Sequence, residues 1–316
     1  MLPSEEIAVL IFLVAVLAVY FTAAWIAAHY LCARFARKAP DFTRRWLWAL
    51  RVIMGLATLV GLATLGLLCA AYAYFVEPYW PEVTHVRVAT AKLPKGTRPI
   101  RIVHISDLHS DPTPRLEARL PGIVAAQEPD LIVFTGDAAN GLAGMPVARR
   151  CLSAIAEIAP TFAVTGNWDS PRLYDGTGVR LLHAQAVRLD VRGVQFWLGG
   201  LASGTEASLP SAFDGVPRGA LVVFLYHMPD LIYRLAERHV DLCLAGHTHG
   251  GQVALPFYGA LVTLSQFGKR FEAGLYRVGE TWLYVNRGIG MEGGPLPRVR
   301  FWSRPEITVV ELAPAE

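Results

Sequence analysis

Two long stretches without a charged side chain, residues 7–33 and 52–76, constrain the fold of this chain more than any other feature. A helix needs about 20 residues to cross the hydrocarbon core of a bilayer, and each stretch exceeds that length. The first stretch is too long for the apolar region of a cleavable signal peptide, and a second follows it closely. The sequence therefore predicts a two-helix transmembrane hairpin within residues 1–80.

The charges around these stretches predict the orientation of the hairpin. Basic residues lie in and just after the connecting loop: Arg34, Arg37, Lys38, Arg44, Arg45 and Arg51. The outer flanks carry Glu5, Glu6, Glu77 and Glu82 instead. Because short loops rich in Lys and Arg stay in the cytoplasm, we expect the loop there. The rest of the chain would then lie on the extracytoplasmic side of the inner (cytoplasmic) membrane.

The overall charge and the cysteines exclude other classes of protein. Lys and Arg total 29 and Asp and Glu total 26, a net charge of +3 that does not favour a nucleic-acid partner. The cysteines are Cys32, Cys69, Cys151 and Cys243, and none forms a CxxC pair. The sequence therefore predicts neither a zinc knuckle nor a disulfide framework, and the cysteines are expected to be small buried hydrophobes.

A proline-containing segment, residues 81–97, is expected to be an extended linker, because prolines stiffen a connection. The domain beyond it, residues 98–316, alternates short apolar runs with helical patterns. Buried strands are predicted at residues 100–105, 131–134, 161–164, 221–226 and 242–245, and helices at 147–159 and 230–239. This alternation is typical of an α/β domain. Strands around 283–286 and 307–312 have no clear helix between them and suggest a second, more antiparallel sheet.

Polar side chains follow each of the first five predicted strands. The metal-competent ones are Asp107, His109, Asp137, Asn167, His227, His247 and His249. The carboxyl ends of strands in an open α/β sheet form the ligand crevice, so these side chains are expected at one edge. A set of His, Asp and Asn without Cys suits Mn²⁺, Fe or Zn²⁺. Seven ligands are too many for one tetrahedral ion and suit two ions that share a carboxylate.

The order D-x-H, G-D, G-N-x-D, H, G-H-x-H over roughly residues 98–312 resembles the calcineurin-like metallophosphoesterases. The segment GHTHGGQV at 246–253, with the turns at 287–290 and 304–307, is similar to the membrane-associated or exported bacterial branch of the YkuE/YaeI type. The resemblance implies a four-layer αββα metallophosphoesterase sandwich with a metal site at the strand ends.

The resemblance also implies the role of each candidate residue. Asp107, His109, Asp137 and His249 would hold a first ion, and Asp137, Asn167, His227 and His247 a second. Asp137 would bridge the two ions, and Asn167 would also touch a phosphate oxygen. With two divalent ions, Mn²⁺ before Fe or Zn²⁺, a bound hydroxide would attack phosphorus in line. Asp137, Asn167 and His227 are thus expected to be catalytic.

Trp168 stands where the family usually has a His that contacts phosphate and protonates the leaving oxygen. Trp cannot act as a general acid, and the loss of one costs about 10²–10⁴-fold in rate. The loss matters least when a phosphate leaves, so Trp168 favours pyrophosphate-type substrates over alkyl esters. Asp169 or a metal-bound water could supply the proton instead, or Trp168 could only reshape the pocket wall.

Two other features are open to more than one interpretation. Arg287, Arg298 and Arg300 surround a glycine-rich turn and could either grip an anionic substrate or be solvated surface residues. His104 lies inside a strand, where core packing or a contact behind the ligands is expected. Tyr79 and Trp80 follow the second span and suit an interfacial aromatic belt, or simply pack.

These observations predict a membrane-anchored hydrolase of phosphoesters or phosphoanhydrides. Its expected partners are the bilayer and a phosphorylated small-molecule or lipid-linked substrate of the cell envelope. One alternative is a UDP-2,3-diacylglucosamine pyrophosphatase, which needs a cytoplasmic site and so conflicts with the charges of the loop. The other is a metal-binding scaffold that has lost catalysis, which Trp168 alone supports.

Overall fold

The computed structural model describes residues 17, 20, 21, 24, 25, 27–29, 31, 41–293 and 298–315. The chain divides into two compact units, Met1–Tyr74 with Gly294–Pro297, and Phe75–Gly293 with Arg298–Glu316. Most of the first predicted span, residues 7–33, lies outside the described residues.

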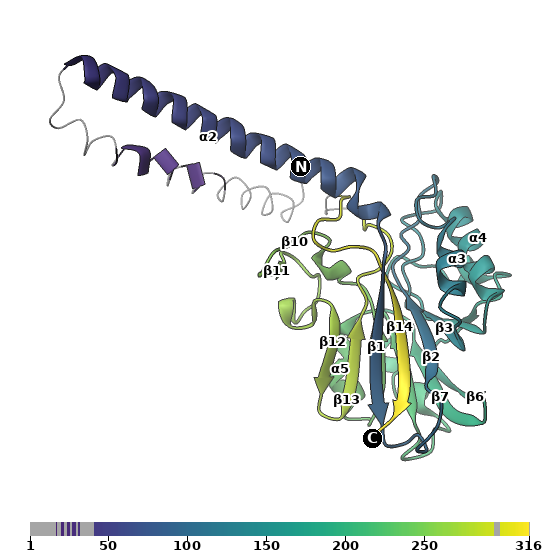
Figure 1. The fold of residues 1–316 in the computed structure, drawn as a ribbon. Coiled ribbons are helices and arrows are strands. Elements are labelled where there is room, and N and C mark those ends of the chain that lie inside the picture. The colour runs from purple at the N-terminus through teal and green to yellow at the C-terminus, as the bar shows by residue number, and fades with distance from the viewer. Residues whose placement is uncertain are drawn as a thin grey trace. The chain divides into compact units, whose positions relative to one another are not determined.

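The second predicted span forms part of a longer helix, α2 (Asp41–Phe75), of 35 residues (Figure 1). It begins ahead of the predicted span because Arg, Leu and Trp are compatible with a helix even where charge interrupts the apolar run. Among the described residues, one helix is long and apolar enough to cross a membrane, Phe42–Tyr79, with a mean hydropathy of 2.3. No part of its most apolar window is buried against protein.

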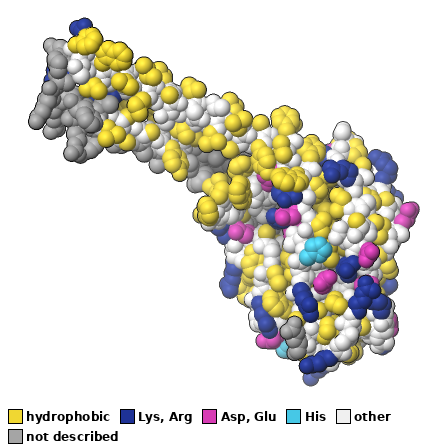
Figure 2. All heavy atoms as spheres, in the orientation of Figure 1, with side chains coloured by type: hydrophobic (Ala, Val, Ile, Leu, Met, Phe, Trp, Pro, Cys, Tyr) yellow, Lys and Arg dark blue, Asp and Glu magenta, His cyan; other side chains and the backbone are white. Residues whose placement is uncertain are grey.

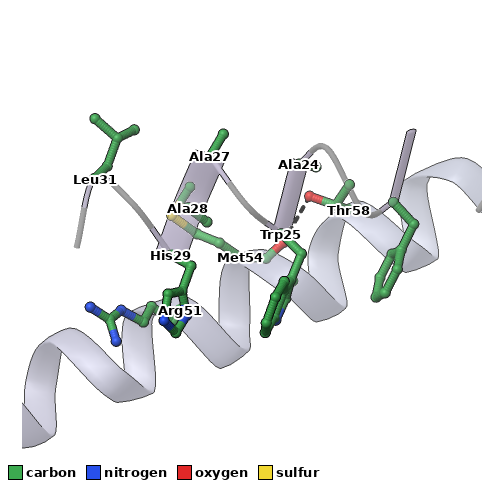
Figure 3. Close-up of a pocket in the computed structure, with 11 residues that line it drawn as sticks. Ala24, Trp25, Ala27, Ala28, His29, Leu31, Arg51, Met54 and Thr58 are labelled. Carbon is green, nitrogen blue, oxygen red and sulfur yellow. Dashed lines mark hydrogen bonds between the residues drawn. The ribbon is translucent and has the colours of Figure 1, made fainter. Parts of the chain in front are cut away.

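A pocket in this first unit is lined by α2 and by described residues between 21 and 31 (Figure 3). Figure 3 shows Trp25 and His29 pointing toward α2, near Arg51, and their rings are 5.1 Å apart. The other lining residues are mainly apolar, and none of the described ones is acidic. The pocket contains none of the seven candidate ligands, which all belong to the second unit.

The second unit is built on two six-stranded sheets and one small hairpin (Figure 1). The first sheet has, in spatial order, β1 (Glu82–Thr90), β14 (Glu306–Pro314), β2 (Ile100–Ile105), β3 (Leu131–Phe134), β4 (Thr161–Ala163) and β5 (Arg180–Leu181). The second has β12 (Gly274–Val278), β13 (Thr281–Val285), β9 (Leu242–Ala245), β8 (Val222–Tyr226), β7 (Val194–Leu201) and β6 (Gln185–Val191). The hairpin pairs β10 (Ala254–Leu255) with β11 (Gly259–Ala260).

The helices of this unit are short. The α-helices are α3 (Leu120–Ala125), α4 (Met145–Ala156) and α5 (Ile232–Ala236). The 3-10 helices are η1 (Glu77–Tyr79), η2 (Pro171–Tyr174), η3 (Glu206–Ser208), η4 (Ser211–Phe213), η5 (Pro229–Leu231), η6 (His249–Gly251) and η7 (Gly268–Phe271). The helix predicted at 147–159 corresponds to α4, which begins two residues earlier than predicted and ends three residues earlier. The helix predicted at 230–239 corresponds to η5 followed by the short helix α5.

Alternating side chains of the central strands feed different core clusters, because neighbouring residues of a strand face opposite sides of the sheet. Ile102 of β2 belongs to a cluster that also contains Leu244 of β9, so this cluster joins the two sheets. Val103 belongs to a second cluster with residues of α3 and α4, and Cys243 to a third with residues of α5. Each such buried Ile or Leu contributes about 1.5–3 kcal/mol. The result is a mixed α/β fold.

The five strands predicted to carry the site do occur, but they do not form one open sheet. β2, β3 and β4 belong to the first sheet, and β8 and β9 to the second. The two later strands also do not form a sheet of their own. β13 pairs parallel with β9, and β14 pairs parallel with β1 and antiparallel with β2. The local sequence shows that each strand is buried, but not which distant strand it pairs with.

The segment 81–97 was expected to be an extended linker, but part of it forms a strand. Residues Glu82–Thr90 form β1, which pairs with β14 along its whole length. Pro81 and Pro94 flank the strand and do not interrupt it, so the proline pattern is compatible with both structures. The chain thus enters the first sheet only seven residues after the end of α2.

Candidate metal centre

The loops that follow five of the strands meet at one end of the second unit. β2, β3 and β4 run parallel, as do β8 and β9, so the carboxyl ends of each group share an edge. Several hydrogen bonds join these edges. The Ile289 amide donates to Ser106 O at 3.0 Å, and the His247 amide donates to Asp107 Oδ1 at 3.2 Å. The candidate ligands therefore come from loops of both sheets.

A first cluster consists of Asp107, His109 and His249, whose ligand atoms lie within 4.8 Å of one another. Nε2 of His109 is 3.2 Å from Nε2 of His249. Oδ1 of Asp107 is 3.5 Å from Nε2 of His249 and 4.0 Å from Nε2 of His109. Atoms bound at ~2.1 Å to one ion are about 3–4 Å apart. The first cluster thus has the spacing of side chains that share an ion.

A second cluster consists of Asp137, His227 and His247, with the same limit of 4.8 Å. Nε2 of His227 is 3.2 Å from Oδ2 of Asp137 and 3.2 Å from Nδ1 of His247. Oδ2 of Asp137 is also 3.6 Å from Nε2 of His109, which belongs to the first cluster. Asp137 of the second cluster therefore also borders the first cluster.

Hydrogen bonds on the far side of three imidazole rings determine which nitrogen faces the clusters. Nδ1 of His109 lies 2.9 Å from Asn140 Oδ1, and Nδ1 of His227 lies 2.8 Å from the Thr135 carbonyl. Both partners are acceptors, so Nδ1 carries the proton and Nε2 presents its lone pair. His247 is reversed, because its Nε2 faces the Leu264 carbonyl at 3.3 Å and leaves Nδ1 for the cluster. These rings are oriented as metal ligands.

Burial keeps three of the four histidines neutral at pH 7. It lowers the pKa of His109 and of His247 to about 4, and that of His249 well below its ordinary value. Burial also opposes the charge of His227, but the adjacent Asp137 carboxylate outweighs it and raises the pKa of His227 to about 10. Neutral imidazole is the form that binds a cation. A proton on His227 would offset the charge of the buried Asp137 carboxylate.

Five of the seven candidates have a backbone conformation that side chains other than glycine rarely adopt. The φ values are 52° at Asp107, 39° at His109, 58° at Asp137, 70° at His247 and 52° at His249. Each such residue costs of order 1–3 kcal/mol, and strain of this kind concentrates at functional sites. Buried carboxylates and imidazoles held at this cost are typical of groups that bind cations.

Two glycines allow the loops to approach this closely. A Cβ on Gly166 would lie 2.1 Å from Asp137 Oδ1, and one on Gly246 would lie 2.0 Å from Ser106 Oγ. Any side chain at either position would displace a loop that carries a candidate ligand.

Asn167 differs from the other candidates because its side chain is exposed. Its backbone nevertheless lies beside Asp137. Gly166 abuts the Asp137 carboxylate, and the amide of Trp168 donates to Asp137 Oδ1 at 2.9 Å. Six candidates therefore converge in the two clusters, and the seventh borders the shared carboxylate.

Asp169 connects the loops after β3 and β4. Its carboxylate accepts the backbone amides of Asp137 at 2.8 Å, Ala138 at 2.8 Å and Gly166 at 3.0 Å. It also accepts the Tyr174 hydroxyl at 2.7 Å. Burial raises the pKa of Asp169, with a further contribution from Asp137. With both oxygens accepting, Asp169 is a structural residue and a poor source of the proton for a leaving group.

Trp168 is hydrogen-bonded to an acid that sequence reasoning missed. Its indole Nε1 donates to Oε1 of Glu292 at 3.3 Å, and its ring lies edge-on to His109 at 6.0 Å. Glu292 is buried, and its Oε2 has no hydrogen-bond partner among the described residues. Burial raises the pKa of Glu292 to about 7, although the Trp168 N–H opposes the shift. No local motif marks Glu292, because 124 residues separate it from Trp168.

The three arginines near the glycine-rich turn have structural partners. Arg300 is fully buried and donates to the carbonyls of Gly290 at 2.9 Å and His249 at 3.2 Å, so it is not a solvated surface residue. Arg287 pairs with Glu82 and Glu306, and Arg298 with Asp111. His104 is buried, with Nε2 2.9 Å from Thr135 Oγ1, and lies behind the clusters as expected.

Comparison with known proteins shows which family the chain is similar to. A family model described as "Calcineurin-like phosphoesterase" matches residues 100–251. The chain is 34% identical to the uncharacterized metallophosphoesterase YkuE of Bacillus subtilis, over 76% of this chain and 88% of that protein. It is 32% identical to the phosphodiesterase YaeI of Escherichia coli, over 76% and 92%. It is also 30% identical to the transmembrane protein with metallophosphoesterase domain of Bos taurus, over 87% and 65%.

Proposed function

We propose that this chain acts through two divalent ions at the membrane. The premise is that it belongs to the calcineurin-like phosphoesterase family, in the branch of YkuE and YaeI, and is a metal-dependent phosphoester hydrolase. The observation that carries this proposal is the pair of buried clusters that share Asp137. A structural cluster of buried acids and histidines would not need two sets of ligand atoms arranged around one carboxylate.

In this proposal Asp107, His109 and His249 hold the first ion, His227, His247 and Asn167 hold the second, and Asp137 bridges them. When bound, the ions supply Lewis acidity and a nucleophilic water at neutral pH. Mn²⁺ is the proposed metal, with Fe or Zn²⁺ as alternatives, because nitrogen and oxygen donors without thiolate suit these ions. Asn167, whose exposed side chain follows the glycine that borders Asp137, is proposed to touch a phosphate oxygen.

Glu292 is the proposed proton donor to the leaving oxygen, in place of the His that the family usually has at position 168. Its Oε2 has no partner among the described residues, whereas the oxygens of Asp169 already accept hydrogen bonds. The Trp168 indole would hold Glu292 through Oε1 and leave Oε2 to carry the proton. Glu292 thus adds to the proton sources that the sequence suggested, which were Asp169 and a metal-bound water.

Glu292→Gln is expected to slow hydrolysis of phosphodiesters with an alkoxide leaving group by about 10²-fold. It should change hydrolysis of bis-p-nitrophenyl phosphate little, because nitrophenolate leaves without a proton. The pKa of Glu292 is raised to about 7, so its acid form is lost, and activity falls, as pH rises through that value. Cations bound at Asp107 and Asp137 would favour the ionised carboxylate of Glu292, so the fall in activity would then occur at a lower pH. Steady-state rates against pH for both substrates test this, and equal losses on both would contradict it.

The proposed location is the cytoplasmic membrane, with residues 7–33 and 52–76 as two spans and residues 98–316 as an extracytoplasmic catalytic domain. The long apolar helix supports the second span, and relatives named as transmembrane proteins support membrane association. The basic residues around 34–51 support a cytoplasmic loop. An alkaline phosphatase reporter fused to the C-terminus should therefore be active, and an inactive reporter would reverse the proposed orientation.

We also propose that the domain is a four-layer αββα sandwich. The three core clusters support this arrangement, since one joins the two sheets and the others include residues of α3, α4 and α5.

The substrate proposed is a phosphoester or phosphoanhydride of a lipid-linked or other envelope compound. The direct test measures hydrolysis by the purified full chain, with Mn²⁺ and with a chelator, of bis-p-nitrophenyl phosphate and of UDP-2,3-diacylglucosamine. Turnover that depends on metal supports the proposal. Preference for the nucleotide substrate would favour the pyrophosphatase alternative, which the absence of His at position 168 also supports. No turnover of either compound by protein that still binds metal would favour a scaffold.

A further inference from the structure

Strand pairing determines which end of the catalytic unit receives the chain from α2. β1 runs parallel to β14, with Glu82 opposite Glu306, and β14 runs antiparallel to β2, with Thr308 opposite His104. The first residue of β1 therefore lies beside the end of β2, at the edge that carries Asp107. Glu82 comes seven positions after Phe75, so the connecting chain can span at most about 25 Å. The metal-binding edge is thus the edge tethered to the apolar helix.

Exposed aromatic side chains are concentrated in the segments at this edge. We define the aromatic ledge as Tyr79, Trp80, Phe257, Tyr258 and Trp302. Phe257 is completely exposed, and Trp302 and Trp80 are 62% and 53% exposed. Figure 2 shows hydrophobic side chains gathered over the β10–β11 hairpin and around the start of β1, with some charged side chains among them and others toward the opposite end of this unit. Aromatic groups in water at this density indicate a surface that something else covers.

Hydrogen bonds connect the three segments of the ledge to one another and to the metal centre. The Trp302 amide donates to Glu77 Oε2 at 2.9 Å, which fixes this loop to the turn that carries Tyr79 and Trp80. The Ala254 amide donates to Phe301 O at 2.8 Å, which attaches the hairpin to the same loop. Ser303 Oγ donates to the carbonyl of the candidate ligand His249 at 2.6 Å. The ledge and the metal centre are therefore parts of one connected framework.

The chemistry of the ledge matches a lipid headgroup region. The Arg304 guanidinium lies 4.2 Å from the centre of the Trp80 ring, and the Lys269 ammonium lies 4.3 Å from that of Tyr258. Aromatic rings prefer the membrane–water interface, and neighbouring cations attract anionic phosphates. Phe257 and Trp302 also have φ values of 66° and 56°, in the region that favours glycine. Bulky aromatic residues are thus retained where both their exposure and their backbone conformation are unfavourable.

We propose that the aromatic ledge inserts into the headgroup region of the bilayer that anchors α2, so that the metal centre acts on phosphate groups presented at that bilayer surface. This rests on the membrane anchoring and the hydrolase activity proposed above. The occupant is a lipid surface, not a second protein copy, because the Tyr79–Trp80 part of the ledge directly follows the apolar helix in sequence. It narrows the substrate class to compounds whose phosphate is held at the membrane by a lipid.

The first test places a photo-crosslinking p-benzoylphenylalanine at Phe257, Trp302 or Lys95 in the full chain, reconstituted in vesicles of phosphatidylethanolamine and phosphatidylglycerol. Lys95 is an exposed matched control in the turn between β1 and β2, at the opposite edge of the same sheet. Phospholipid adducts are expected at 257 and 302 and not at 95. Adducts no more frequent at 257 and 302 than at 95 would overturn the proposal, as would crosslinks to a second copy of the chain.

A second test separates this proposal from the activity itself. The double variant Phe257→Ser, Trp302→Ser should raise the KM for hexadecyl p-nitrophenyl phosphate in vesicles about tenfold, with soluble bis-p-nitrophenyl phosphate hydrolysed as before. Equal effects on both probes would count against the ledge. Crosslinking is also measured in Asp137→Asn, which needs no turnover. Lipid adducts in an unchanged chain that hydrolyses neither probe would support the ledge and remove the hydrolase proposal, whereas loss of the adducts in Asp137→Asn would count against a ledge that contacts lipid without turnover.

Discussion

Asp137→Asn is expected to lower the Mn²⁺-dependent hydrolysis of bis-p-nitrophenyl phosphate by about 10³-fold or more. Asp137 Oδ2 lies 3.2 Å from Nε2 of His227 and 3.6 Å from Nε2 of His109, so one carboxylate serves both clusters. A neutral amide cannot bridge two cations, and Lewis-acid stabilisation is worth several kcal/mol, at about 1.4 kcal/mol per tenfold in rate. Initial rates, with bound metal counted by mass spectrometry, measure the loss.

The Asn variant is chosen because it should fold. The amide oxygen can still accept the Trp168 N–H that Asp137 Oδ1 accepts. Asp214→Asn, at an exposed site in the same unit, makes the same chemical change and should have no effect on the rate. If Asp137→Asn kept its activity within about tenfold of the unchanged protein and bound both ions, a bridging role would be excluded.

Asp169→Ala is expected to cause the largest loss of stability in the catalytic unit, about 3–5 kcal/mol. The substitution leaves three backbone amides and the Tyr174 hydroxyl without their acceptor in the interior. Each unsatisfied buried donor costs about 1–3 kcal/mol, and water or local movement recovers part of the sum. For a unit of this size the melting temperature should fall by roughly 10 °C.

Thermal unfolding in detergent, followed by fluorescence, checks this expectation against Asp214→Ala as the exposed control. Asp169→Asn should lie between the two, since one amide oxygen can still accept from the loops. A melting temperature of Asp169→Ala equal to that of the control would show that the loops after β3 and β4 do not depend on this carboxylate. Asp169→Ala is also expected to weaken metal binding, because the backbone amide of Asp137 is one of the three amides that donate to Asp169.

These two variants separate two functions of neighbouring acids. Asp137 and Asp169 lie in successive loops, and both are buried or nearly so, but their partners differ. Asp137 faces imidazole nitrogens, and Asp169 faces backbone amides. Asp137→Asn should therefore lower the rate of hydrolysis with little change in stability. Asp169→Ala should mainly lower the stability of the unit.

The sequence alone determined which short segments are strands and which residues end them. The predicted bounds of β2, β3 and β9 match the structure, because buried strands are short runs of branched and aromatic residues between turn signals. Six of the seven candidate ligands converge for the same reason, since each follows a strand whose carboxyl end lies at a common edge. These are local properties of the chain together with one general rule of α/β architecture.

Only the tertiary structure decided which strands pair and which distant side chains meet. β1 and β14 are neighbours although more than 200 residues separate them in the chain, and the ligands belong to two sheets, not one. Asn140, Thr135 and Leu264, which orient the imidazoles, and Glu292, which meets Trp168, are not themselves part of the motif blocks. Local sequence specifies the conformation and burial of a segment. Contacts between distant segments depend on how all the segments pack together.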